Sequence, residues 1–126
     1  MPNTVKTIKL QKSLKSNQLA DMIGKLSLTK NAENVLSIDV RKVSSSADYF
    51  IICSAETGLQ VQAIANAVRK GTPIKPWHIE GLEHQNWVLL DYVDVVLHVF
   101  KTQVREFYSL EKLWADAPTV EITDEP

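Results

Sequence analysis

Hydrophobic and polar positions follow two different periods along this chain. Apolar residues recur at every third or fourth position in residues 14–26 and again within residues 57–71, which predicts two amphipathic helices. Shorter apolar runs at residues 35–40 and 49–54 predict two strands. The run at 49–54 is almost continuous, as is typical of a central strand buried on both faces.

The second half of the chain has mainly extended patterns. Two prolines bracket a short edge strand that leads to residues 79–81, and residues 87–100 read as a hairpin around a short polar turn. Residues 103–114 predict one or two short helical turns. The order of elements predicts one α/β domain over residues 16–117, with helices packed on a mixed sheet of about five strands.

The two ends of the chain differ in charge from the domain between them. Residues 1–15 contain four lysines and no acidic residue, which predicts a basic, loosely ordered arm. Residues 118–126 are acidic and poor in apolar side chains, which predicts a disordered tail.

Composition excludes several classes of function. The chain of 126 residues has a formal net charge of −1, whereas a protein that holds nucleic acid through its phosphates needs a basic excess; we expect little direct nucleic-acid contact. The chain has a single cysteine, Cys53, so it cannot form an internal disulfide, and a reducing, cytoplasmic location is indicated. We expect Cys53 to be buried and unreactive. No apolar run reaches the roughly 18 residues of a membrane span, so no membrane association is expected.

The hairpin at residues 87–100 carries three residues that a core strand does not need. Trp87 opens it, Tyr92 lies beside the turn and His98 interrupts the return strand. Side-chain alternation predicts Trp87 and Tyr92 on opposite faces of the sheet. Both residue types are common in cores and at interfaces, so the residues alone leave burial and partner binding open.

No pattern indicates a catalytic residue, a metal site or a bound cofactor. The three histidines are not at ligand spacing, the four glycines are scattered singly, and serine nucleophile motifs are absent. Asp91 and Asp94 flank the hairpin turn and are expected to stabilise it through hydrogen bonds to the backbone. One enzymatic alternative stays open, in which Asp39, Asp48 and Asp91 hold magnesium in a nucleotidyltransferase-like enzyme.

Several short motifs follow one another in a recognisable order. The hairpin is followed by Arg105-Glu106-Phe107-Tyr108 and Leu110-Glu111-Lys112-Leu113-Trp114, and upstream lie Ile38-Asp39-Val40 and Ala47-Asp48-Tyr49-Phe50. In this order they resemble the ribosomal silencing factor family, RsfS or Iojap-like. The resemblance runs from about Leu19 to Ala117, which is nearly the whole domain.

The resemblance implies a protein that is not an enzyme, with a fold similar to that of nucleotidyltransferases. Members of the family bind the large ribosomal subunit through ribosomal protein uL14, block docking of the small subunit and so repress translation when nutrients are scarce. Carried over onto this chain, the expected uL14 contacts are Trp87, Tyr92, Leu90, Val95, Lys75, Glu80 and His98. Exposed aromatic residues on this face would also favour a homodimer that competes with ribosome binding.

At the hairpin tip the chain has Val93, where the family usually has glycine. Glycine permits a positive φ, which costs a β-branched residue about 1–2 kcal/mol. The turn therefore either uses a negative φ or is strained, and the placement of Tyr92 depends on which.

Overall fold

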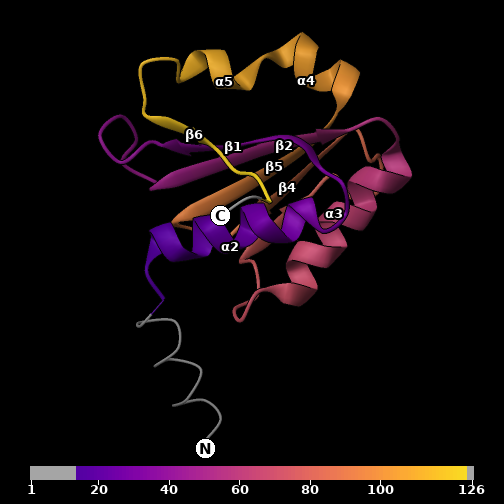
Figure 1. The fold of residues 1–126 in the computed structure, drawn as a ribbon, viewed down its shortest axis with the longest axis horizontal. Coiled ribbons are helices and arrows are strands. Elements are labelled where there is room, and N and C mark those ends of the chain that lie inside the picture. The colour runs from indigo at the N-terminus through magenta and orange to yellow at the C-terminus, as the bar shows by residue number, and fades with distance from the viewer. Residues whose placement is uncertain (1–13, 125–126) are drawn as a thin grey trace, which may run out of the picture.

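The computed structural model describes residues 14–124, which form a six-stranded mixed sheet with helices on both sides (Figure 1). The strand order is β3-β4-β5-β2-β1-β6. Strands β2 and β5 pair in parallel and the other neighbours are antiparallel. The predicted α/β class and mixed sheet are confirmed, with one strand more than expected. The strands are β1 (Glu33–Asp39), β2 (Tyr49–Ala55), β3 (His78–Glu80), β4 (Trp87–Asp91), β5 (Val95–Lys101) and β6 (Thr119–Glu121).

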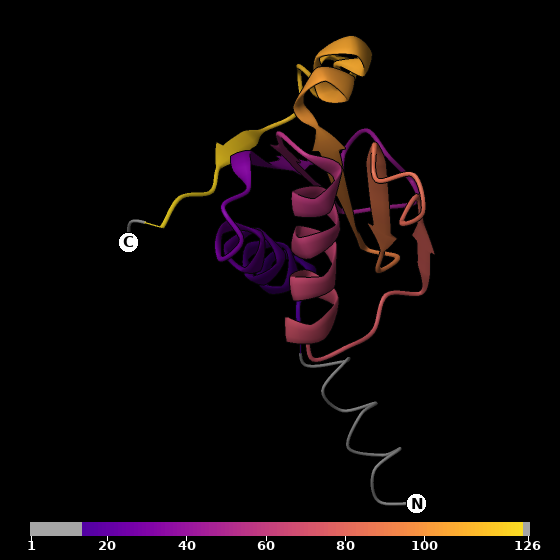
Figure 2. The same ribbon diagram turned by 90° about the vertical axis from the view of Figure 1, so that its right-hand side faces the viewer.

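Helices cover the two faces of the sheet unequally. The long helices α2 (Ser16–Leu28) and α3 (Gly58–Gly71) lie side by side on one face, as Figure 2 shows. The short helices α4 (Thr102–Tyr108) and α5 (Leu110–Leu113) lie on the opposite face (Figure 1). Thr57 caps α3, because its side-chain oxygen accepts a hydrogen bond from the Gln60 amide at 3.2 Å. Among the described residues, no helix is both long and apolar enough to span a membrane.

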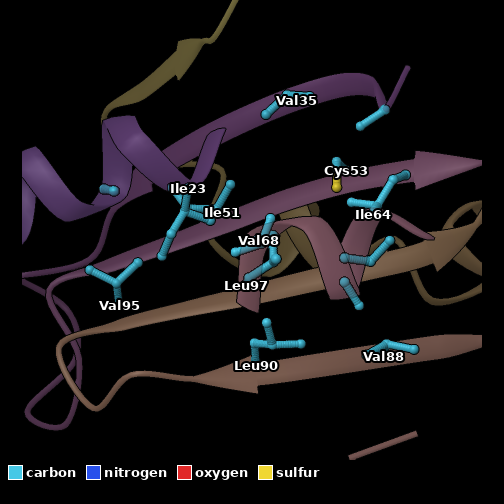
Figure 3. Packing of buried hydrophobic residues seen from close by; sticks show 14 of the residues in the cluster. Ile23, Val35, Ile51, Cys53, Ile64, Val68, Val88, Leu90, Val95 and Leu97 are labelled. Atoms are coloured by element: carbon cyan, nitrogen blue, oxygen red, sulfur yellow. The ribbon is translucent and has the colours of Figure 1, made fainter. Parts of the chain in front are cut away.

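The main core fills the space between the sheet and the two long helices. Its strand residues alternate with those of the opposite face, as period-two packing requires. Figure 3 shows Leu90, Val95 and Leu97 pointing into this cluster together with Ile23 and Val68 from the helices. Cys53 belongs to the same core with none of its surface exposed, which confirms its expected burial.

A smaller cluster lies under α4 and α5 on the other face. Its fully buried members include Ile38, Ile52 and Phe100, and several partly buried aromatic residues pack against them. Helix α4 packs mainly on β5 and β2, so most of β4 and β3 has no helix over it on this face.

The prediction of a disordered tail was wrong for residues 119–122. Strand β6 pairs with the outer edge of β1, with Ser37 opposite Val120, and the following Ile122 is buried against Gly24 of α2. Backbone pairing does not depend on apolar side chains, so a polar segment can add to a free sheet edge when one apolar residue anchors it. The predicted basic arm falls mostly on residues 1–13, which together with residues 125–126 lie outside the described part of the chain.

Candidate protein-binding face

Strands β4 and β5 present alternate residues to the side of the sheet away from α2 and α3. Cross-strand pairs on this side are Trp87 with Phe100, Leu89 with His98 and Asp91 with Val96. We call the surface of β3, β4 and β5 on this side the hairpin face. Trp87 packs here against the smaller cluster while Tyr92 belongs to the main core, so the prediction that they point to opposite faces is confirmed.

Trp87 is half-buried at the centre of an aromatic group. Its ring stacks on Phe100 with centroids 4.6 Å apart and lies 5.1 Å from the ring of Tyr108 on α4. Its indole N–H donates a hydrogen bond to Nδ1 of His98 at 3.1 Å. One side of the indole is thus held by the protein, and the other borders a shallow hollow of about 280 Å³ beside Glu80 and Leu89.

His98 is buried and uncharged in this setting. Burial lowers the pKa of its imidazole to about 4, and the nearby Asp91 carboxylate opposes this only in part. Since Nδ1 accepts the bond from Trp87, the proton of the neutral ring is on Nε2. Phe50 packs edge-on against the ring at 5.5 Å between centroids.

Two exposed aromatic residues on α4 extend the aromatic group beyond the hairpin. Phe107 is 81% exposed and Tyr108 is 54% exposed, and their rings pack edge to face with centroids 5.1 Å apart. Sequence reasoning did not select them as site residues. The signal that could have identified them is two adjacent aromatic residues on one helix, since only one of them can point to the sheet.

Arg105 anchors α4 and α5 to the sheet. It is buried and forms an ion pair with Glu111 of α5 at 2.8 Å. It also donates to the carbonyl of Asn34 at 2.9 Å and to the Ser54 hydroxyl at 3.1 Å. The register of β1 shifts near Asn34, whose φ is 49°. Arg105 supplies the hydrogen-bond donor for the Asn34 carbonyl at this irregularity.

The hairpin tip is a tight and strained turn. Val93 has φ of 77°, and the Asp94 amide bonds the Tyr92 carbonyl at 3.1 Å, which is the pattern of the rare γ-turn with a positive central φ. The Asp91 carboxylate accepts the Val93 amide at 2.7 Å, which confirms its expected role in the turn. Of the two alternatives for Val93, the strained one is correct.

The structure separates the seven predicted contact residues into accessible and buried sets. Trp87 is partly accessible, and Lys75 and Glu80 are exposed. Leu90 and Val95 are inside the main core, and Tyr92 is buried with its hydroxyl 2.9 Å from that of Thr72. The burial of these three residues and of His98 argues against a direct contact with a partner. Their side chains either point into the core or are covered by neighbouring residues, so a partner cannot reach them.

Trp77 is a further residue that the sequence did not single out. Its side chain is 83% exposed just before β3, and its amide donates to the Asp91 carbonyl at 2.7 Å. It borders a second hollow, of about 460 Å³, that Ile74 and the strained Val93 also line. This hollow lies at the tip end of the hairpin.

The enzymatic alternative is not favoured by the arrangement of its three carboxylates. Asp39 is bound by Arg41 through two contacts of 2.9 and 2.7 Å, and this partner lowers the pKa of the carboxyl. Asp91 is occupied with the hairpin turn. Within residues 14–124 no three His, Cys, Asp or Glu side chains converge as a metal ion would require.

Comparison with known proteins relates nearly all of this structure to one family. The chain is 47% identical to the ribosomal silencing factor RsfS of Halalkalibacterium halodurans, over 74% of this chain and 82% of that protein. It is 43% identical to RsfS of Bacillus subtilis, over 74% and 81%. It is also 31% identical to the mouse protein named "mitochondrial assembly of ribosomal large subunit protein 1", over 75% of this chain and 44% of that protein.

Solved structures and a family model agree with these relatives. A crystal structure from Chromobacterium violaceum superposes with a TM-score of 0.78 at 27% identity, covering 80% of this chain and 87% of that one. One from Bacillus halodurans gives a TM-score of 0.72 at 39% identity, covering 83% and 98%. The family model described as "ribosomal silencing factor during starvation" matches residues 13–126, and the chain therefore belongs to the RsfS family.

Proposed function

We propose that this protein is a non-enzymatic ribosomal silencing factor that binds the large ribosomal subunit through ribosomal protein uL14. Family membership supports the silencing role, and the name of the mouse relative refers to the large subunit. Bound to uL14, the protein would occupy space that the small subunit needs, and so repress translation under nutrient limitation in the cytoplasm. The near-neutral net charge of −1 is in keeping with a protein contact rather than one made mainly to RNA.

The observation that carries this proposal is the continuous aromatic surface from the hairpin face onto α4. Trp87, Tyr108 and Phe107 are linked by ring distances of 5.1 Å at each step, and Phe107 and Tyr108 are exposed. Tryptophan and tyrosine anchor many protein interfaces because they bury a large rigid area at little entropic cost. Such a surface has no evident role within a single folded chain.

Charge around this surface favours a basic partner. Asp94 is exposed at the hairpin tip and Asp91 is partly exposed beside it. Glu80 is exposed on β3 opposite Leu89, where its carboxylate lies 3.0 Å from Nε2 of His78. A basic patch on uL14 would complement these carboxylates, speed association and make binding weaker at high salt.

The test is binding of isolated uL14 to the full chain, measured by calorimetry. Trp87→Ala should weaken binding by about 2 kcal/mol or more, which is roughly thirtyfold, and Phe107→Ala by about 1 kcal/mol. Leu59→Ala is the matched control, because Leu59 is 75% exposed on α3, away from the hairpin face. Equal affinities for Trp87→Ala and the control, with both proteins folded, would exclude the hairpin face.

A second experiment addresses silencing itself. Purified subunits are mixed with the protein, and the fraction of joined ribosomes is read from a sucrose gradient. The wild type should lower that fraction and sediment with the large subunit, and Trp87→Ala should do neither. If the hairpin face also forms a homodimer, sedimentation of the free protein should show a dimer that uL14 dissociates.

A further inference from the structure

We infer that His98 is a positioning residue for Trp87: its Nδ1 accepts the indole N–H and holds the indole in the orientation that the hairpin face presents to a partner. This inference rests on the proposed function and assigns His98 a role behind the interface instead of a contact in it. It explains why a histidine occupies a buried strand position among apolar residues.

The two residues are diagonal neighbours across the β4–β5 pair. Trp87 lies opposite Phe100, and His98 is two positions before Phe100 on β5. The rings of Trp87 and His98 are 5.9 Å apart between centroids at 44°, and the Nε1 to Nδ1 distance is 3.1 Å. Phe100 stacks with both rings, at 4.6 and 6.2 Å, so the indole cannot turn without losing both the stacking and the hydrogen bond.

A neutral imidazole suits this position because its unprotonated Nδ1 can accept the indole N–H. A protonated ring would present a donor to the indole N–H, and an apolar residue would leave that N–H without a partner in a half-buried place. Burial lowers the pKa of the ring and keeps it neutral. The negative charge of Asp91 raises the pKa, but by less than burial lowers it. The indole is therefore oriented before a partner arrives, which reduces the entropy lost on binding.

The hydrogen bond can be tested without a partner, by following the indole N–H signals of the full-length protein with NMR. The three tryptophans differ: Trp77 is exposed, Trp87 donates to His98, and Trp114 has a buried Nε1 with no acceptor among the described residues. Trp77→Phe and Trp114→Phe assign the signals. His98→Leu should shift the Trp87 signal and speed its exchange with solvent. His98→Asn, whose amide oxygen can replace Nδ1, should keep both near the wild type.

Binding of isolated uL14 then tests the positioning role. His98→Leu should weaken binding about tenfold, and His98→Asn should restore it to within about threefold of the wild type. In a Trp87→Phe background, which lacks the indole N–H, His98→Leu should cause no further loss, because the two residues act through one bond.

Each outcome separates this inference from the proposed function. An unmoved Trp87 signal in folded His98→Leu would show that the bond is absent and overturn the inference. A moved signal with unchanged binding would overturn the positioning role and leave the hairpin face intact. If the wild type does not bind uL14 at all, the proposed function fails together with the role of His98 in binding, and the NMR result still decides the bond.

Discussion

Replacing Arg105 with methionine tests how α4 and α5 are held on the sheet. The change keeps an unbranched apolar stem and removes the guanidinium group, with its charge and donors. Contacts to Glu111, the Asn34 carbonyl and the Ser54 hydroxyl, all within 3.1 Å, are lost at once. The Glu111 carboxylate then stays partly buried, with 27% of its side-chain surface exposed, and has no counter-charge there.

The expected loss of unfolding free energy is about 3 kcal/mol. Removing one partner of a buried ion pair costs about 3–5 kcal/mol, and the partial exposure of Glu111 places this pair at the lower end. For a domain of this size, such a loss lowers Tm by roughly 10 °C. Glu111→Gln keeps an oxygen that can accept from Arg105 but leaves that more deeply buried guanidinium without its counter-charge, so its expected cost is about 2 kcal/mol.

Urea unfolding followed by circular dichroism measures these differences. The double variant Arg105→Met with Glu111→Leu is the control, because it removes the stranded carboxylate and should recover much of the stability. A loss below about 1 kcal/mol for Arg105→Met, or a double variant no more stable than the single one, would refute this account of the anchor.

Three further predictions concern the hairpin. Val93→Gly should raise the unfolding free energy by about 1 kcal/mol in urea titrations, because φ of 77° strains valine more than the flexibility of glycine costs; a drop would contradict the strain. Tyr92→Phe should cost about 1 kcal/mol through the lost bond to Thr72 and leave uL14 affinity unchanged, and weaker binding by the folded variant would place Tyr92 in the interface after all. The free energy of unfolding should fall by up to about 3 kcal/mol as the pH drops from 6.5 to 4. Over this range His98 is protonated in the unfolded chain, whereas burial keeps it neutral in the folded protein; the dependence of stability on pH should be much weaker in His98→Asn.

The local sequence pattern predicted most helices and strands correctly. It did not predict which residues from distant parts of the chain pack against them. Alternation predicted the hairpin and the opposite directions of Trp87 and Tyr92 correctly. By the same alternation Leu90 shares a face with Tyr92, and the structure shows that this face is the buried one. A family resemblance transfers sequence positions and does not say which side chains are accessible. Strand β6 was missed because its pairing depends on a free edge of β1 that forms far away in sequence.

The aromatic residues of α4 were missed for a related reason. Their exposure follows from where Arg105 fixes the helix, through contacts to residues 51 and 71 positions away. No periodicity within a short helix encodes such distant contacts. The accessible part of the candidate site is therefore a tertiary property, although each of its residues is visible in the sequence.

Cys53 gives the protein a built-in reporter of rare openings. Its thiol is fully buried on β2, a central strand of the sheet, and burial raises its pKa to about 12. Thiol reagents attack the thiolate, so labelling has to wait until the strand separates from the helices above it. Because the chain has a single cysteine, the rate at which the native protein is labelled measures how often the middle of the sheet opens. A bound ribosomal partner should lower this labelling rate.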